Sequence, residues 1–216
     1  MRQNSRKISG RYGQSRAEMR GAEDMRVIGI TGGVGSGKSE VLNALKERYG
    51  AAVCQMDETA RGLQQSGTEC FARIVEAFGA EIVGADGELD RGKLGACVFS
   101  DPEKLRLLNR IVHPAVLEAV RADIREKAAA GTRLYVVEAA LLPDVGAELC
   151  DELWYIYVRE DVRRERLRSS RGYTDEKISS MIASQPGEEE FRRACGVVID
   201  NSGTFENTMR QIGDRL

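Results

Sequence analysis

Residues 26–39 read RVIGITGGVGSGKS, and this stretch decides the fold of the chain. Its first six residues are mostly apolar and rich in β-branched side chains, which is typical of a buried strand in a parallel sheet. Five glycines lie within the nine residues 29–37, and an apolar helical pattern resumes at Val41, Leu42 and Leu45. The stretch therefore predicts a strand, a glycine-rich loop and a helix in succession.

Residues 32–39 match the pattern G-x-x-x-x-G-K-[ST] of a phosphate-binding P-loop, in the context that the pattern requires. Glycines let the loop curl its N–H groups inward, and the following helix presents its positive dipole end to the same anion. Lys38 can then reach the β- and γ-phosphates of a nucleotide, and the Ser39 hydroxyl can ligate Mg²⁺. The alternative is a plain glycine-rich turn. We predict that ATP is bound by Gly33, Val34, Gly35, Ser36, Gly37, Lys38 and Ser39.

Composition excludes several classes of protein. The chain has 216 residues and a formal net charge of −2, so no basic field indicates nucleic acid or an anionic membrane as a partner. No apolar stretch approaches the roughly 18 residues of a membrane span. The five cysteines are scattered and form no CxxC pair, which is typical of reduced thiols in the cytoplasm. His113 is the only histidine, so a histidine-based metal site or catalytic triad is not expected.

Residues 1–24 differ in composition from the rest of the chain. They are rich in Arg, Ser, Gly and Gln and lack the apolar core of a secretory signal, although they loosely resemble an organelle transit peptide. We expect a disordered N-terminal extension, or an upstream start on a protein that could begin at Met25.

A second short strand is expected over residues 51–54, followed by Asp57. Ligands of parallel sheets collect at the carboxyl ends of the strands, so an acidic residue here would lie beside the phosphate site. Asp57 is either a solvated helix cap or the carboxylate that accepts a proton from a substrate hydroxyl. Arg61 lies one helical turn further on and shares its face.

Residues 66–130 carry helical patterns almost throughout, with a good helix start at Ser100-Asp101-Pro102-Glu103. A helical block inserted between the second and third strands would form a cap over a substrate. His113, which precedes Pro114, is either a packed or capping histidine or a contact to that substrate.

Three further strands are expected over residues 134–138, 154–158 and 196–200, and a closing helix over 204–216. Glu138 stands at the carboxyl end of the third strand, where it either helps to hold Mg²⁺ or caps the loop that follows. Leu141 lies in that loop and faces the same edge of the sheet.

Six arginines occur between residues 159 and 171, before another helical segment at 175–185. Such a run is usually a solvated helix face. The alternative is a mobile lid, because guanidinium groups suit the charge that spreads over a phosphoryl group during transfer.

Several motifs, in order and at matching separations, carry a family resemblance over about residues 26–214. They are IGITGGVGSGKS at 28–39, Asp57-x-x-Ala60-Arg61, Phe78-Gly79, Asp86-Gly87-x-Leu89-Asp90-Arg91, Leu94-x-x-x-Val98-Phe99, Leu108-Asn109-x-x-x-His113-Pro114 and Val198-Ile199-Asp200-Asn201. With these motifs the chain resembles the dephospho-coenzyme A kinases. The P-loop alone indicates only a nucleotide, whereas the run from Asp86 to Pro114 and the late Asp-Asn pair narrow the family.

The resemblance implies an α/β fold with a P-loop kinase-type parallel sheet of about five strands, flanked by helices. The kinase domain would span 25–216, with a core of 25–65 and 132–216, a helical cap for the coenzyme over about 66–131 and an arginine-bearing lid over about 159–185. The reaction would be phosphorylation of the ribose 3′-hydroxyl of dephospho-coenzyme A by ATP with Mg²⁺, which is the last step of coenzyme A biosynthesis.

Residue roles follow from the same resemblance. Asp57 matches the catalytic aspartate, and Lys38 and Arg166 would act with it. The substrate would be bound by Asp57, Arg61, His113 and Leu141, and adenine contacts are expected near Asn201. The family commonly has Asp-Ala at the positions of Gln55-Met56, and its second lid arginine is displaced here, so Arg171 or Arg168 would replace it.

The alternatives are another small-molecule P-loop kinase, a GTPase switch and an ATP-binding regulator without catalysis. A GTPase is disfavoured because the guanine-reading Asn-Lys-x-Asp is missing from the chain. We expect a cytoplasmic monomer, with an oligomer as the alternative, and neither nucleic acid nor membrane as a partner.

Overall fold

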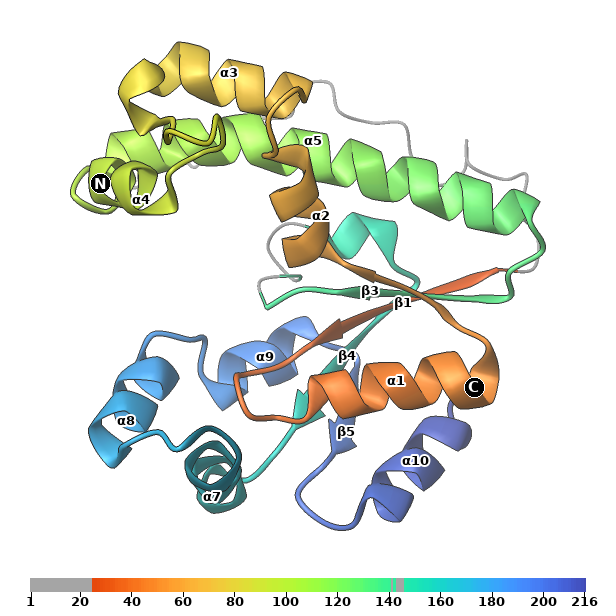
Figure 1. The fold of residues 1–216 in the computed structure, drawn as a ribbon. Helices are drawn as coiled ribbons and strands as arrows, with labels where there is room; N and C mark the ends of the chain where they lie inside the picture. Colours follow the sequence, from red (N-terminus) through yellow and green to blue (C-terminus); the bar gives the residue numbers. More distant parts are fainter. Residues whose placement is uncertain (1–24, 141, 143–145) are drawn as a thin grey trace, which may run out of the picture.

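The computed structural model describes residues 25–140, 142 and 146–216, and its centre is a five-stranded parallel sheet (Figure 1). The expectations for residues 1–24 and for Leu141 lie outside the described residues. The strands are β1 (Arg26–Thr31), β2 (Ala52–Gln55), β3 (Leu134–Glu138), β4 (Glu152–Tyr157) and β5 (Val197–Asp200), in the spatial order β2-β3-β1-β4-β5. The prediction of a parallel sheet of about five strands is confirmed.

Strand β1 occupies the middle of the sheet because it pairs in parallel with β3 on one side and with β4 on the other. Five of its six residues are buried. Burial on both faces explains why the strand is an unbroken apolar run instead of an alternating one. The loop after β1 therefore leaves the sheet at its centre. The chain continues from β1 to β2 on one side of this point, and from β3 to β4 on the other side.

Two layers of helices cover the sheet, and side chains along each strand alternate between them. Leu134 and Val136 of β3 pack with α1 (Lys38–Tyr49) and α10 (Phe205–Gly213). Tyr135 and Val137 of the same strand face the opposite core, to which α5 (Pro102–Ala129) contributes. Figure 1 shows α1 and α10 on one side of the sheet and α5 on the other.

The chain between β2 and β3 is helical, as expected. It forms α2 (Met56–Leu63), α3 (Glu69–Phe78), the 3₁₀ turn η2 (Ala80–Ile82), α4 (Arg91–Phe99) and α5. Asp101 caps the 28-residue helix α5 by accepting the N–H groups of Glu103 and Lys104. Pro114 lies inside α5 without ending it. In Figure 1, α3 and α4 lie against α5 and extend its layer beyond the sheet.

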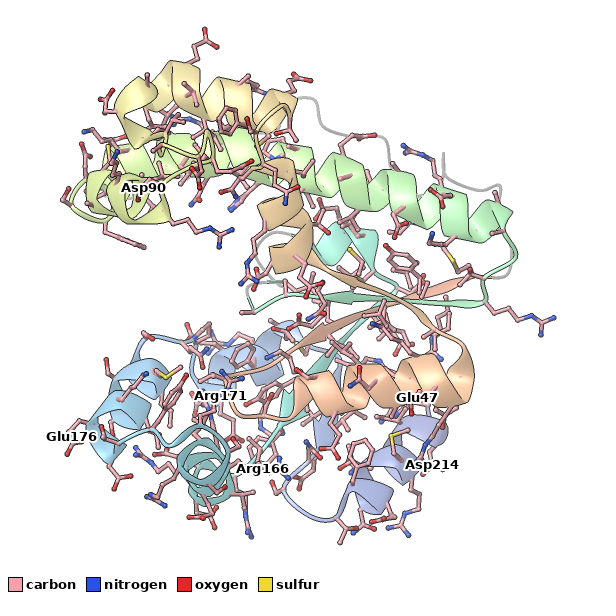
Figure 2. All side chains as sticks on the ribbon, viewed as in Figure 1. Glu47, Asp90, Arg166, Arg171, Glu176 and Asp214 are labelled. Carbon is pink, nitrogen blue, oxygen red and sulfur yellow. The ribbon has the colours of Figure 1, made fainter. Side chains whose placement is uncertain are left out.

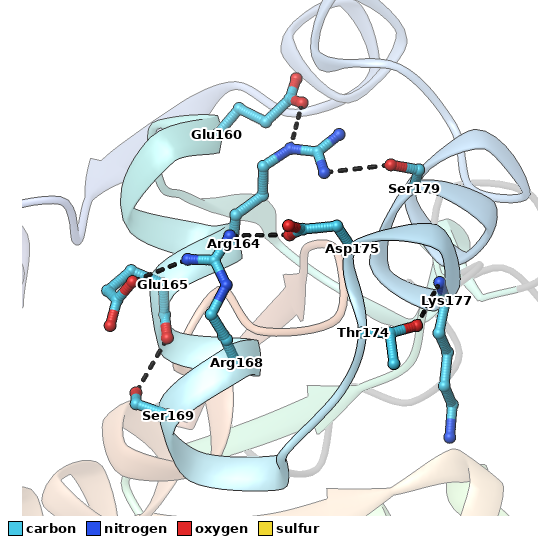
Figure 3. Close-up of polar contacts among 9 residues, drawn as sticks. All are labelled: Glu160, Arg164, Glu165, Arg168, Ser169, Thr174, Asp175, Lys177 and Ser179. Carbon is cyan, nitrogen blue, oxygen red and sulfur yellow. Dashed lines mark hydrogen bonds and ion pairs between the residues drawn. The ribbon is translucent and has the colours of Figure 1, made fainter.

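The chain after β4 forms α7 (Glu160–Arg171), α8 (Asp175–Ala183) and α9 (Glu188–Ala194). Figure 3 shows side chains that join α7 to α8: Arg164 donates to Ser179, and Arg168 pairs with Asp175 at 2.7 Å. The short 3₁₀ turn η3 (Ala147–Leu149) precedes β4. Helix α9 was not predicted from the sequence, and it packs Phe191 against Tyr155 of β4 with ring centroids 4.8 Å apart.

Among the described residues, no helix is both long enough and apolar enough to cross a membrane.

Candidate active site

The loop from Gly32 to Gly37 lies between the end of β1 and the start of α1, as the P-loop pattern predicts. Gly35 and Gly37 have φ angles of 78° and 87°, which side chains rarely adopt. A Cβ atom at position 37 would also overlap Nδ2 of Asn201. Glycine is thus required at position 37 for two independent reasons.

Lys38 turns its ammonium group back over this loop. Its Nζ donates to the Gly32 carbonyl oxygen at 2.7 Å and to the Gly33 carbonyl oxygen at 3.4 Å. Burial lowers the pKa of Lys38, while the nearby Glu138 carboxylate acts in the opposite direction. The P-loop lysine therefore lies in a desolvated pocket, where a cation interacts with an anionic phosphate more strongly than in water.

Glu138 ends β3 and is buried, with 8% of its surface exposed. One carboxylate oxygen lies 3.8 Å from Lys38 Nζ. Burial raises the pKa of Glu138, while Lys38 and a hydrogen bond from the Gln55 side chain lower it. Asp57 is close enough to raise the pKa of Glu138 further by charge repulsion. Two carboxylates and the P-loop lysine thus share one edge of the sheet.

A cavity of about 470 Å³ opens over the loop. It is lined by the residues from Gly33 to Glu40, by Gln55 and Glu138, and by Arg166, Leu167, Ser169, Ser170 and Arg171 of α7. Figure 2 shows Arg166 and Arg171 on α7, beside the loop that leads into α1. Residues 33–39, which were predicted to bind ATP, line this cavity together, so backbone N–H groups and the cationic side chains of Lys38, Arg166 and Arg171 converge on one space.

Arg166 carries a buried nitrogen that needs an acceptor. Within the part of the chain that the structure describes, Nη1 of Arg166 and Oγ of Ser36 are buried without a hydrogen-bond partner. A buried charged group without a partner is costly, and an anion in the adjoining cavity would satisfy it. The arrangement therefore fits a bound phosphate group.

Arg171 and Arg168, the two replacements suggested by the sequence, lie in different surroundings. Arg171 lines the cavity. Arg168 instead pairs with Glu165 at 2.8 Å and with Asp175 at 2.7 Å, as Figure 3 shows. Arg168 is thus engaged between α7 and α8 and does not line the cavity.

Asn201 follows β5 and is hydrogen-bonded to the P-loop. Its side chain is 1% exposed, its Nδ2 donates to the Ser36 carbonyl oxygen at 2.8 Å, and its Oδ1 accepts from the Thr208 hydroxyl at 2.8 Å. Both ends of the amide are therefore used within the protein. The geometry explains a structural need for asparagine here, whereas its contact with ATP stays a prediction.

A second cavity of about 280 Å³ adjoins the first at the junction of β2 and α2. Its lining is largely apolar and comprises Met56, Asp57, Ala60, Gln64, Leu108, Asn109, Val112, His113, Val116, Ala139 and Ala140. Gln55 lines the first cavity, and the next two residues, Met56 and Asp57, line the second. Asp57 is also exposed, so a bound substrate can reach it.

The other predicted substrate residues are placed differently. His113 lies in the middle of α5 and lines the second cavity, and burial lowers its pKa. Arg61 is exposed on α2 and lines neither cavity. Gln55, Gln64 and Asn109 line a cavity although the sequence analysis assigned them no role. Asn109 lies within one of the family motifs, which was a usable signal.

The donor atoms at the first cavity suit Mg²⁺. The exposed Ser39 hydroxyl and the Glu138 carboxylate both line it and offer hard oxygen atoms. Among the described residues, no cluster of three or more His, Cys, Asp or Glu could hold a metal alone. Mg²⁺ commonly binds through one or two protein oxygens and completes its shell with substrate phosphates and water.

A P-loop at the centre of a parallel sheet, adjoined by arginines and by a second cavity with a carboxylate at its mouth, defines a P-loop kinase of a small molecule. The family model described as dephospho-CoA kinase, CoaE, matches residues 26–207. The chain therefore belongs to the dephospho-CoA kinase family.

Individual relatives agree with this placement. The dephospho-CoA kinase of Carboxydothermus hydrogenoformans is 40% identical over 188 residues, which covers 86% of this chain and 90% of that protein. The dephospho-CoA kinase of Geobacillus kaustophilus is 40% identical over 187 residues, which covers 86% of this chain and 92% of that protein. The crystal structure of TT1252 from Thermus thermophilus has a TM-score of 0.72 at 30% identity, and covers 89% of this chain and 97% of that one.

More distant structures share the fold. The dephospho-CoA kinase of Campylobacter jejuni has a TM-score of 0.63 at 18% identity, and covers 88% of this chain and 94% of its own.

Proposed function

We propose that the chain transfers the γ-phosphoryl group of ATP to the ribose 3′-hydroxyl of dephospho-coenzyme A, with coenzyme A and ADP as products. The observation that carries this proposal is the adjacency of two cavities across residues 55–57, one bearing the P-loop and the other bearing Asp57. An acceptor in the second cavity would present its hydroxyl to a γ-phosphate in the first. Family membership supports this pair of substrates.

Asp57 is the proposed general base. In the transfer, a bond forms between the 3′-oxygen and the γ-phosphorus, and the bond from that phosphorus to the bridging β,γ-oxygen breaks. The proton of the hydroxyl passes to the Asp57 carboxylate. Such proton transfer typically contributes 10²- to 10⁴-fold, roughly, to the rate of an enzyme. The exposed position of Asp57 at the mouth of its cavity supports this role.

The P-loop residues Gly33 to Ser39 would hold the triphosphate of ATP through backbone N–H groups and the start of α1. Lys38 would exchange its bonds to the Gly32 and Gly33 carbonyls for the β- and γ-phosphates. Its desolvated surroundings strengthen that attraction. Asn201 would act indirectly, because it holds the Ser36 carbonyl and with it the curvature of the loop.

Arg166 and Arg171 are the proposed lid arginines. The buried Nη1 of Arg166 supports a contact with a phosphate oxygen, and Arg171 lines the same cavity. A planar guanidinium can neutralise charge on the transferring phosphoryl group. We assign residues 159–185 to the lid and about 66–131 to a cap over the coenzyme, which are the boundaries expected from the sequence.

Ser39 and Glu138 would hold Mg²⁺, Ser39 directly and Glu138 directly or through the water of the ion. When bound, Mg²⁺ would supply positive charge that neutralises the negative charge developing on the phosphates during transfer. The second cavity would receive dephospho-coenzyme A, with its apolar wall from α5 and the side chains of Gln64, Asn109 and His113 as polar contacts. Arg61, which is exposed on α2, remains a proposed contact to this large substrate, as does Leu141, which lies outside the described residues.

We keep the monomer expected from the sequence as the proposed working unit. We place the reaction in the cytoplasm, because the five cysteines are scattered along the sequence and form no CxxC pair, a pattern usual in reducing compartments.

A screen of acceptors tests the proposal. The chain is incubated with Mg-ATP and one acceptor at a time: dephospho-coenzyme A, AMP, shikimate or gluconate. The products are identified by mass spectrometry. We expect ADP and a singly phosphorylated product only with dephospho-coenzyme A. Transfer to another acceptor but not to dephospho-coenzyme A would favour a different small-molecule kinase. Replacing ATP with GTP in the same assay tests which nucleotide donates the phosphoryl group.

A further inference from the structure

Both ends of the α7–α8 segment contact the same residue of the P-loop. The Val34 N–H donates to Oε1 of Gln185 at 3.0 Å, and the Val34 carbonyl accepts from Nε of Arg163 at 2.6 Å. Nη2 of Arg163 also donates to Oε1 of Gln185. We call these two side chains and the Val34 peptide the Val34 clamp. The clamp satisfies both backbone groups of a loop residue with side chains more than a hundred positions away.

The two side chains bracket the proposed lid. Arg163 is the fourth residue of α7, and Gln185 comes two residues after the end of α8. Between them, α7 and α8 are joined by Arg164 with Ser179 and by Arg168 with Asp175 (Figure 3). A helix pair that is tied together internally and fixed at both of its ends cannot shift without disturbing Val34.

The Arg163 guanidinium lies directly on the P-loop backbone. A Cβ atom at position 33 would lie 2.5 Å from Nη2 of Arg163, so any larger residue at position 33 would displace this guanidinium. Arg163 is partly buried, and it is close enough to Lys38 for its charge to help lower the lysine pKa. Burial lowers the pKa of Arg163 as well. A half-buried guanidinium with two fixed acceptors is a structural element of the loop and not a solvated side chain.

The same helix carries the phosphate-facing arginine. Arg166 follows Arg163 by three positions and therefore lies on the neighbouring face of α7. Its Nη1 would lie 3.5 Å from a Cβ atom at position 37 of the loop. The contacts of Arg163 thus fix both the shape of the loop and the rotation of the helix that brings Arg166 to it.

We propose that Arg163 and Gln185 are positioning residues that hold the P-loop in its phosphate-binding shape and set Arg166 against it. The inference rests on the proposed function only in that the P-loop binds a nucleoside triphosphate, and it does not depend on the acceptor. If the clamp is lost, the loop occupies its binding-competent shape for a smaller fraction of time, and the apparent dissociation constant for nucleotide rises by the inverse of that fraction.

The test measures binding of the β,γ-imido analogue of ATP, with Mg²⁺ and without acceptor, to the full chain by calorimetry. Arg163→Met and Gln185→Met keep side-chain length but remove the donor and the acceptor. Gln185→Glu keeps an oxygen acceptor for both Val34 and Arg163. Arg159→Met is the matched control, because Arg159 is exposed at the start of α7. Among the described residues, its ion pair is with Asp161, which is also exposed. Thermal unfolding of each variant is recorded in parallel.

We expect each Met variant to weaken nucleotide binding by about 10-fold, the order expected for hydrogen bonds to a charged group. The nucleotide dissociation constant of the double variant should lie within about 2-fold of that of each single variant, because the two side chains act as one unit. Gln185→Glu and Arg159→Met should stay within about 2-fold of the wild type. In steady state, KM for ATP should rise while KM for the acceptor stays unchanged.

Met variants that melt at a lower temperature yet bind nucleotide like the wild type would overturn the proposal, because the clamp would then be merely structural. If Arg163→Met fails to fold, Gln185→Met against Gln185→Glu gives the same contrast. A wild-type chain that binds the analogue but does not phosphorylate dephospho-coenzyme A would contradict the proposed function and leave this test intact.

Discussion

The ammonium nitrogen of Lys38 lies 3.8 Å from a carboxylate oxygen of Glu138, and both groups are largely withdrawn from water. Burial disfavours the charged form of each, so it lowers the pKa of Lys38 and raises that of Glu138, while each partner opposes the shift of the other. Because both groups line the larger cavity, an arriving triphosphate and its metal ion would compete for this pair. If Glu138 helps to hold Mg²⁺ as proposed, the pair would link phosphate binding to metal binding.

Replacing Glu138 with Gln should weaken the response to Mg²⁺. The amide keeps the size of the side chain but loses the negative charge, so the Mg²⁺ concentration that gives half-maximal activity should rise by about 10-fold or more. Titration of Mg²⁺ at saturating ATP measures this. Glu47→Gln, on the exposed face of α1, is the control and should leave the titration unchanged. An unchanged titration for Glu138→Gln would mean that Glu138 only caps its loop.

Arg171 and Arg168 should differ in their effect on turnover. Arg171 lines the cavity, so Arg171→Met should lower kcat by about 10-fold or more, and Arg166→Met by about 10³-fold. Arg168 is engaged by Glu165 and Asp175, so Arg168→Met should stay within about 2-fold of the wild type. Steady-state kinetics at saturating substrates measures all three variants. Equal losses for Arg168→Met and Arg171→Met would contradict the assignment.

Asn201 should contribute to stability through the P-loop. Asn201→Ala removes the donor to the Ser36 carbonyl and the acceptor of the Thr208 hydroxyl, and such buried losses cost about 1–3 kcal/mol. Urea denaturation measures the free energy of unfolding. Asn207→Ala, at an exposed position of α10, should change it by no more than about 0.5 kcal/mol. If both variants were equally stable, the buried amide would not hold the loop.

His113 should make stability depend on pH in a known direction. Burial lowers its pKa below 6.5 in the folded chain, so the unfolded chain binds more protons between the folded pKa and 6.5. Its contribution to stability is therefore fully present above 6.5 and is lost as the pH falls through the folded pKa. Because His113 is the only histidine, a ¹H NMR titration of the chain reports its pKa directly.

The free energy of unfolding of wild type minus that of His113→Gln should then become smaller as the pH falls from about 8 to about 5. An NMR pKa at or above 6.5 would contradict the buried position of His113 beside the second cavity.

Local pattern was enough to predict the sheet and the P-loop. The third strand was expected over residues 134–138, and β3 has these bounds, because a short apolar run that contains Tyr135, Val136 and Val137 favours a buried strand. Helix α9 escaped prediction because it has seven residues with only one fully buried, Phe191. Its stability comes from packing on Tyr155, which no local pattern reveals.

The site was predictable only where a motif carries it. Motifs placed Lys38, Asp57 and His113 beside the two cavities. The distinction between Arg168 and Arg171 depends on Asp175, which engages one of them in space. Contacts such as Arg163 with Val34 join residues far apart in sequence and follow from the topology of the sheet, so the sequence gives no local sign of them.

We propose above all that Asp57 accepts the proton of a substrate hydroxyl in the second cavity. That hydroxyl receives the phosphoryl group of a nucleotide bound in the first cavity. The most direct measurement identifies the product formed by the full chain from Mg-ATP and dephospho-coenzyme A, using mass spectrometry and ³¹P NMR, for the wild type and for Asp57→Asn. Glu58→Gln, the exposed neighbour, is the control. We expect the wild type and Glu58→Gln to make a 3′-phosphate, and Asp57→Asn to show a kcat lowered by about 10²-fold or more with nucleotide binding unchanged. Wild-type turnover in Asp57→Asn, or a phosphate at another position, would contradict it.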